Sequence, residues 1–187
     1  IIIGFVSVVG MSSINKDVKD ISENWLPTIK SVGEINSMVN EYRRNELVHI
    51  LATDESLMRQ YENKIQNLTG SINEKVKEYE KLITEPEEKI AFPKFLAAWK
   101  GYLENHAKIE VLSKSNKTEE AVKLVLGPAR AQYVEALDQL KVIIDINNKG
   151  SKTSAADAEA AYERGKLLTI SLIIAVMLAA TAISILI

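Results

Sequence analysis

The distribution of charged residues constrains this chain more than any other feature of its sequence. Every Lys, Arg, Asp and Glu lies between Lys16 and Lys166, so the first 15 and the last 21 of the 187 residues carry no charge. As a helix, the apolar residues 167–187 would be roughly 31 Å long, which matches the ~30 Å hydrocarbon core of a bilayer. The sequence therefore predicts a transmembrane helix at residues 167–187.

Residues 1–14 are also apolar, but they are fewer than the ~18 residues expected of a complete membrane span. They show no initiator Met, basic stretch or small-residue cleavage site typical of a secretory signal. We interpret them as the end of a first, truncated transmembrane helix, with the end of a buried helix as the alternative. The charged region would then lie on one side of the membrane, and it is too long for the positive-inside rule to say which side.

The overall composition excludes several classes of protein. The 25 acidic and 23 basic residues give a net charge of −2, so the chain lacks the basic surface that nucleic acid requires. There is no Cys for disulfides, thiol catalysis or metal binding. Only 8 Gly and 4 Pro leave few turns for an all-β fold or a many-looped α/β enzyme.

Apolar residues recur at spacings of three and four through the charged region, and no stretch alternates with period two. This pattern predicts an all-α fold, an antiparallel up-down four-helix bundle flanked by the two transmembrane helices. We expect the bundle to occupy residues 15–166. Its expected helices cover about residues 15–53, 55–84, 86–112 and 128–166, with a short helix at about 118–126.

The pair Gly127-Pro128 is the reason for dividing the last part of the bundle. A straight helix from Thr118 to Lys166 would be much longer than its antiparallel counterpart, and proline favours the first turn of a helix. A single kinked helix is the alternative. A second proline, Pro86, marks another helix start, where Thr84 and Glu87 are expected to form a capping box.

No constellation of residues supports an enzyme, so we assign no catalytic residue, metal or cofactor. His49 and His106 show no metal-binding spacing, and no nucleophile elbow, phosphate-binding loop or dinucleotide fingerprint is present. Glu46 and His49 form one Glu-x-x-His pair, but a di-iron bundle needs two. The acidic cluster EPEEK is explained by the favourable dipole at a helix start.

The segment NEYRRNE contains the most informative polar residues. Arg43 falls on the apolar face of its helix, and Arg44 is rotated by about 100° from it, so the two side chains face the bundle interior and a neighbouring surface. A structural ion pair of Arg43 with Glu46 or Glu41 is the alternative to a binding role. Because arginine recognises carboxylates in a planar, two-pronged manner, these residues with Asn40 indicate a small organic acid as the ligand.

Counting residues from the bundle tip suggests further contacts near the start of the last helix. Free backbone N–H groups beside Gly127-Pro128 would favour an anion there. Arg130 and Tyr133 are the expected second contacts, although a core position is the better single explanation of Tyr133. His106 is better explained as a hydrogen-bonded core histidine.

The segments ENWLPTIKSVGEIN, EYRRNELVHIL, FPKFLAAWKGYLE and EEAVKLVLGPARAQYVEALDQLKVIIDIN, between two apolar ends, carry a family resemblance. The chain resembles the four-helix-bundle sensor module of bacterial methyl-accepting chemotaxis receptors. The same module occurs on some sensor kinases and cyclases, so a histidine kinase or cyclase sensor is an alternative, as is a bundle that recognises a periplasmic protein.

The resemblance implies a periplasmic sensor in the inner membrane, a homodimer in contact with membrane lipid that binds ligand near the membrane-distal dimer interface. It places Arg43 and Arg44 in the ligand-binding part of the first bundle helix, and Arg130, Gln132 and Tyr133 in that of the fourth. Binding would be transmitted through the fourth helix and the second span to a cytoplasmic adaptor and kinase, reached through parts C-terminal to this sequence. The choice among carboxylate ligands stays open.

Overall fold

The computed structural model describes residues 2–186, and for residues 2, 3, 5–7 and 186 the description is limited to the backbone. Ile1 and Ile187, at the ends of the two apolar segments, lie outside the described residues. The described chain is helical with no strand, which confirms the predicted all-α class. Its elements are α1 (Ile2–Lys19), the π-helical segment η1 (Asp20–Trp25), α2 (Leu26–Leu51), α3 (Glu55–Glu80), α4 (Pro86–Lys114), α5 (Thr118–Leu126) and α6 (Pro128–Leu186).

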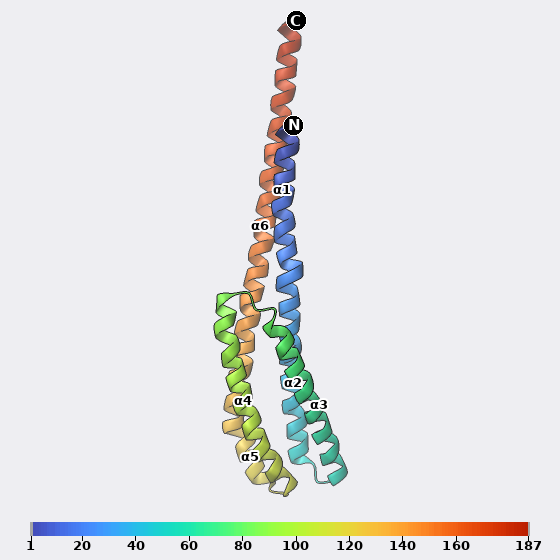
Figure 1. Cartoon of the computed structure of the whole chain (residues 1–187), viewed down its shortest axis with the longest axis vertical. Coiled ribbons are helices and arrows are strands. Elements are labelled where there is room, and N and C mark those ends of the chain that lie inside the picture. The colour runs from blue at the N-terminus through green and yellow to red at the C-terminus, as the bar shows by residue number, and fades with distance from the viewer. Residues whose placement is uncertain (1, 187) are drawn as a thin grey trace. The chain divides into compact units, whose positions relative to one another are not determined.

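The chain divides into two compact units, Pro27–Asn147 and a second unit made of Ile1–Leu26 with Asn148–Ile187. The first unit is the four-helix bundle, formed by α2, α3, α4 and the first part of α6, with the short α5 between α4 and α6 (Figure 1). Short connections join consecutive helices, which makes them antiparallel. Its fully buried side chains include Ile35, Tyr42, Ile72, Phe95, Tyr102, Leu140 and Ile143.

Side-chain caps explain where α3 and α4 begin. Asp54 Oδ1 accepts a hydrogen bond from the Leu57 N–H at 2.9 Å and so caps α3. The capping box of α4 is formed by Glu85 and Glu88, so the prediction of Thr84 and Glu87 was wrong by one residue. The reason is that Pro86 occupies the first helical position, which makes Glu85 the N-cap and Glu88 the third residue of the helix.

The break at Gly127 has the predicted position. α5 ends at Leu126 and α6 begins at Pro128, so a single kinked helix from Thr118 is wrong. The Ala131 N–H donates to the Gly127 carbonyl at 3.2 Å, which closes the first turn of α6. Pro128 removes no hydrogen bond from this turn, because the first N–H groups of a helix have no intrahelical acceptor.

The first bundle helix differs from the expected residues 15–53. Helical structure runs from α1 through η1 into α2 without a gap and ends at Leu51. The wider turn of η1 directly precedes α2, whose second residue is Pro27. Since a proline inside a helix removes one hydrogen bond and crowds the carbonyl four residues earlier, a π-helical turn is a physical means of accommodating it.

The second unit pairs α1 and η1 with the C-terminal part of α6. The Trp25 Nε1–H donates to Ser154 Oγ at 3.1 Å, and the indole ring lies against Gly150. The described residues contain one helix long and apolar enough to cross a membrane; its most apolar window reaches a mean hydropathy of 2.5 and is not buried at all. The predicted boundaries between the bundle and the two membrane helices, at residues 14/15 and 166/167, stay predictions.

Candidate functional site

A buried ion pair occupies the centre of the polar part of α2. Arg43 is 8% exposed and Glu46 is 1% exposed, and Arg43 Nη1 lies 3.0 Å from Glu46 Oε2. The other terminal nitrogen of Arg43, Nη2, donates to the Val125 carbonyl at 2.5 Å. The interior position predicted for Arg43 is confirmed, and its carboxylate partner is Glu46.

Two side chains of α4 also form hydrogen bonds with Glu46. The Tyr102 hydroxyl donates to Oε2 at 2.6 Å, and His106 Nδ1 lies 2.8 Å from Oε1. Burial, followed by the negative charge of Glu46, raises the pKa of Tyr102, so its hydroxyl stays a donor. Because an ionised carboxylate only accepts hydrogen bonds, His106 carries a proton on Nδ1. Both oxygens of Glu46 are therefore engaged within the chain.

Aromatic rings and amides surround the Arg43 guanidinium. Its central carbon lies 5.4 Å from the centre of the Tyr133 ring and 5.8 Å from that of Tyr102, within cation–π range. The Tyr133 hydroxyl donates to Asn40 Oδ1 at 2.7 Å, and Asn40 Nδ2 donates to the Asn36 carbonyl at 2.6 Å. Asn40, Arg43 and Tyr133 thus form one cluster that links α2 to α6.

The other three predicted site residues lie outside this cluster. Arg44 and Arg130 are exposed, and neither guanidinium group makes an ion pair or a hydrogen bond with any described residue. Gln132 is half-buried and packs on α4, since a Cβ added at Gly101 would lie 2.9 Å from Gln132 Oε1. The two exposed guanidinium groups are therefore the ones available to a ligand or partner.

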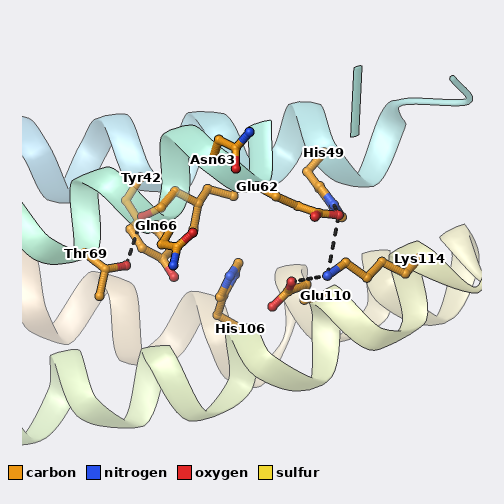
Figure 2. A pocket seen from close by; sticks show the side chains of 10 residues that line it. Tyr42, His49, Glu62, Asn63, Gln66, Thr69, His106, Glu110 and Lys114 are labelled. Atoms are coloured by element: carbon orange, nitrogen blue, oxygen red, sulfur yellow. Dashed lines mark hydrogen bonds and ion pairs between the residues drawn. The ribbon is translucent and has the colours of Figure 1, made fainter. Parts of the chain in front are cut away.

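A second site, which the sequence did not predict, lies between α2, α3 and α4. It is a cavity of about 430 Å³ into which side chains of all three helices point (Figure 2). No group of three or more His, Cys, Asp or Glu among the described residues is arranged to hold a metal ion. The cavity is lined by Tyr42, His49, Glu62, Asn63, Ile65, Gln66, Thr69, His106, Glu110 and Lys114.

Ion pairs link several of the residues that line this cavity. His49 Nε2 lies 3.1 Å from Glu62 Oε1, and Lys114 Nζ lies 3.5 Å from the same oxygen and 2.5 Å from Glu110 Oε1. Burial acts to raise the pKa of Glu62, but the hydrogen bond with His49 and the charge of Lys114 outweigh it and hold that pKa below its usual value. The hydrogen bond to Glu110 raises the pKa of Lys114, so the lysine is charged.

The polar residues of α3 show why sequence reasoning missed the cavity. Ile65 and Ile72 lie on the apolar face of α3, and both are buried. Glu62, Gln66 and Thr69 recur at the same spacings of three and four, beside that face. A polar stripe adjoining an apolar one is the signal that could have indicated a polar cavity.

A second buried carboxylate holds the other end of the bundle together. Glu88, fully buried, accepts a hydrogen bond from the Tyr79 hydroxyl at 2.8 Å and a further one from Asn147 Nδ2. These contacts join α3, α4 and α6.

Comparison with known proteins adds two findings. A family model described as "Four helix bundle sensory module for signal transduction" matches residues 1–162. The chain is also 25% identical, over 178 residues, to a protein of Bacillus subtilis (strain 168) that is named as a sensory transducer, YvaQ. This match covers 95% of the chain and 31% of the relative, so the chain spans about a third of that protein.

Proposed function

Because the chain belongs to the family of four-helix-bundle sensory modules for signal transduction, we propose that it is the ligand-sensing segment of a transmembrane chemoreceptor. The bundle is proposed to lie outside the cytoplasmic membrane, which is the periplasm in a cell with an outer membrane. The apolar end of α6 would anchor it in the bilayer. This assignment rests on the family and on the membrane-length helix.

The proposed ligand is a small organic acid held by Arg44 and Arg130. The observation that carries this proposal is that both guanidinium groups are exposed and lack a partner among the described residues, whereas Arg43 is buried and neutralised by Glu46. The hydrogen bonds from Arg43 to Val125 and from Tyr133 to Asn40 hold α2 beside the start of α6. These contacts support the proposal that Arg44 and Arg130 share one part of the bundle surface.

We propose that two copies of the chain complete the site. Exposed arginines on one surface repel each other, and a dicarboxylate bound between two protomers would neutralise them. Asn40, Arg43 and Tyr133 would position α2 and α6 beneath this surface, with Gln132 at its edge. Binding would shift the equilibrium between two arrangements of α6, which continues to Leu186, by its difference in affinity for them.

Calorimetry on the whole chain in lipid nanodiscs tests this function, with succinate, malate and citrate as ligands. We expect at least one acid to bind, and Arg44→Ala or Arg130→Ala to weaken binding about tenfold, the value of one charge-assisted contact. Arg59→Ala is the matched control, because Arg59 is also exposed but pairs with Glu55 on α3. Equal binding by all three variants would overturn the proposed site.

A further inference from the structure

The cavity between α2, α3 and α4 lies within one protomer and takes no part in the proposed carboxylate site. We propose that this cavity binds a small organic amine, whose ammonium group replaces that of Lys114 between Glu62 and Glu110. The proposal stands on the cavity and its charges, and it adds a second ligand class to the proposed function.

The size and lining of the cavity are those of a small-molecule site. Its volume of about 430 Å³ falls within the roughly 300–1,000 Å³ that such sites span. The Tyr42 ring and Ile65 provide apolar surface, while Asn63 and Gln66 provide amide groups. A ligand that combines a hydrocarbon part with one polar head would suit these walls.

The charges that line the cavity favour a cation. Two carboxylates, Glu62 and Glu110, face the single positive charge of Lys114, so the lining carries an excess of negative charge when His49 and His106 are neutral. A carboxylate ligand would add to this excess, whereas an ammonium group would remove it.

The hydrogen-bond acceptors that line the cavity also favour a cationic ligand. Because Glu46 binds the Nδ1 proton of His106, the neutral ring presents Nε2 as an acceptor. The carboxylates of Glu62 and Glu110 are also acceptors. An ammonium group offers three donors and no acceptor, so it matches this set.

Lys114 shows where such a group would bind. Its ammonium lies 2.5 Å from Glu110 Oε1 and 3.5 Å from Glu62 Oε1, at the end of a flexible side chain that is 47% exposed. Glu62, by contrast, is 26% exposed and is also held by His49. The lysine can therefore swing into solvent while Glu62 stays in place, so it acts as a tethered cation that a free amine displaces.

Ligand-observed NMR on the whole chain in nanodiscs tests this proposal with three probes of one shape. These probes are 2-phenylethylamine, the neutral 2-phenylethanol and the anionic 3-phenylpropanoate, and empty nanodiscs serve as the blank. We expect the amine alone to show protein-dependent line broadening. Broadening by the acid or the alcohol to the same extent would overturn the charge argument.

Substitutions at the three charged residues sharpen the test. Lys114→Met should raise amine affinity at least about threefold, because it removes a competing ion pair of ordinary strength. Glu62→Gln with Glu110→Gln should abolish amine binding, while Glu74→Gln, an exposed carboxylate change on α3, should leave it unchanged.

Weaker amine binding by Lys114→Met than by the wild type, or no amine binding by either, would overturn the proposal. If the double Gln variant unfolds, the comparison of amine binding by Lys114→Met and by the wild type still tests the proposal. Carboxylate binding measured on the same samples separates this site from the proposed function, because Arg44→Ala should leave amine binding intact.

Discussion

Arg43 and Arg44 are adjacent in the sequence but lie in opposite environments. The rotation of about 100° per residue buries Arg43 against Glu46 and leaves Arg44 in solvent. A buried guanidinium with a carboxylate, a carbonyl and two aromatic partners is already satisfied, whereas an exposed one can bind a ligand. The predicted arginine pair is therefore one structural residue and one candidate binding residue.

Removing the Arg43 side chain should destabilise the bundle strongly. Arg43→Ala leaves the carboxylate of Glu46 buried without its cationic partner, so we expect a loss of about 3 kcal/mol in the free energy of unfolding. Arg44→Ala should change it by less than about 0.5 kcal/mol, because that side chain is exposed. Chemical unfolding followed by circular dichroism measures both, and equal effects would contradict the assignment of Arg43 as structural.

Glu62 should contribute stability that depends on pH. Its pKa is lowered in the folded state, so the ionised carboxylate stabilises the fold above its usual pKa of about 4.5, and this contribution is lost as the pH falls through the folded-state value. The melting temperature of Glu62→Gln, compared with the wild type from pH 6 to pH 3, should therefore differ most at pH 6. A difference that stays constant over this range would contradict the pairing with His49 and Lys114.

At the scale of the elements, the sequence predicted helices better than their interactions. The break at Gly127-Pro128 and the short α5 follow from local rules for proline, so both were predictable. The segment η1 and the cavity beside α3 depend on how helices pack, which apolar spacing alone does not encode. Pro27 and the polar stripe on α3 were the available signals.

The contacts of the candidate site residues also depend on how the helices pack, so the sequence predicted them only in part. The interpretation of His106 as a hydrogen-bonded core histidine is confirmed, because it is buried and contacts Glu46, the partner of Arg43. The contact of Arg43 with the Val125 carbonyl could not be predicted, because it depends on the path of α5 between α4 and α6.

The packing of η1 on α6 should make Gly150 intolerant of a side chain. A Cβ at Gly150 would overlap the Trp25 ring, and this overpacking at about 1–3 kcal/mol outweighs the roughly 1 kcal/mol by which Ala favours a helix over Gly. Gly70→Ala is the matched control, since no atom lies within 4 Å of its Cβ. We expect Gly150→Ala to lower the melting temperature and Gly70→Ala to raise it; an increase for both would show that Trp25 does not pack there.

At the scale of the whole molecule, α6 is the element that would connect the proposed ligand site with the membrane. It begins at Pro128, beside the proposed carboxylate site, and continues as one helix through the apolar segment to Leu186. The family to which the chain belongs is defined by sensory signal transduction. A ligand that changes the equilibrium of this helix could therefore be detected on the other side of a bilayer.

The most direct test of the central claim joins this chain to the cytoplasmic part of a chemoreceptor whose kinase output can be measured. The account predicts that an acid bound by the purified chain changes kinase activity in membranes containing this fusion, and that Arg44→Ala and Arg130→Ala reduce the response while Arg59→Ala preserves it. Kinase activity that stays constant at saturating concentrations of the bound acid would contradict a sensory role for the chain.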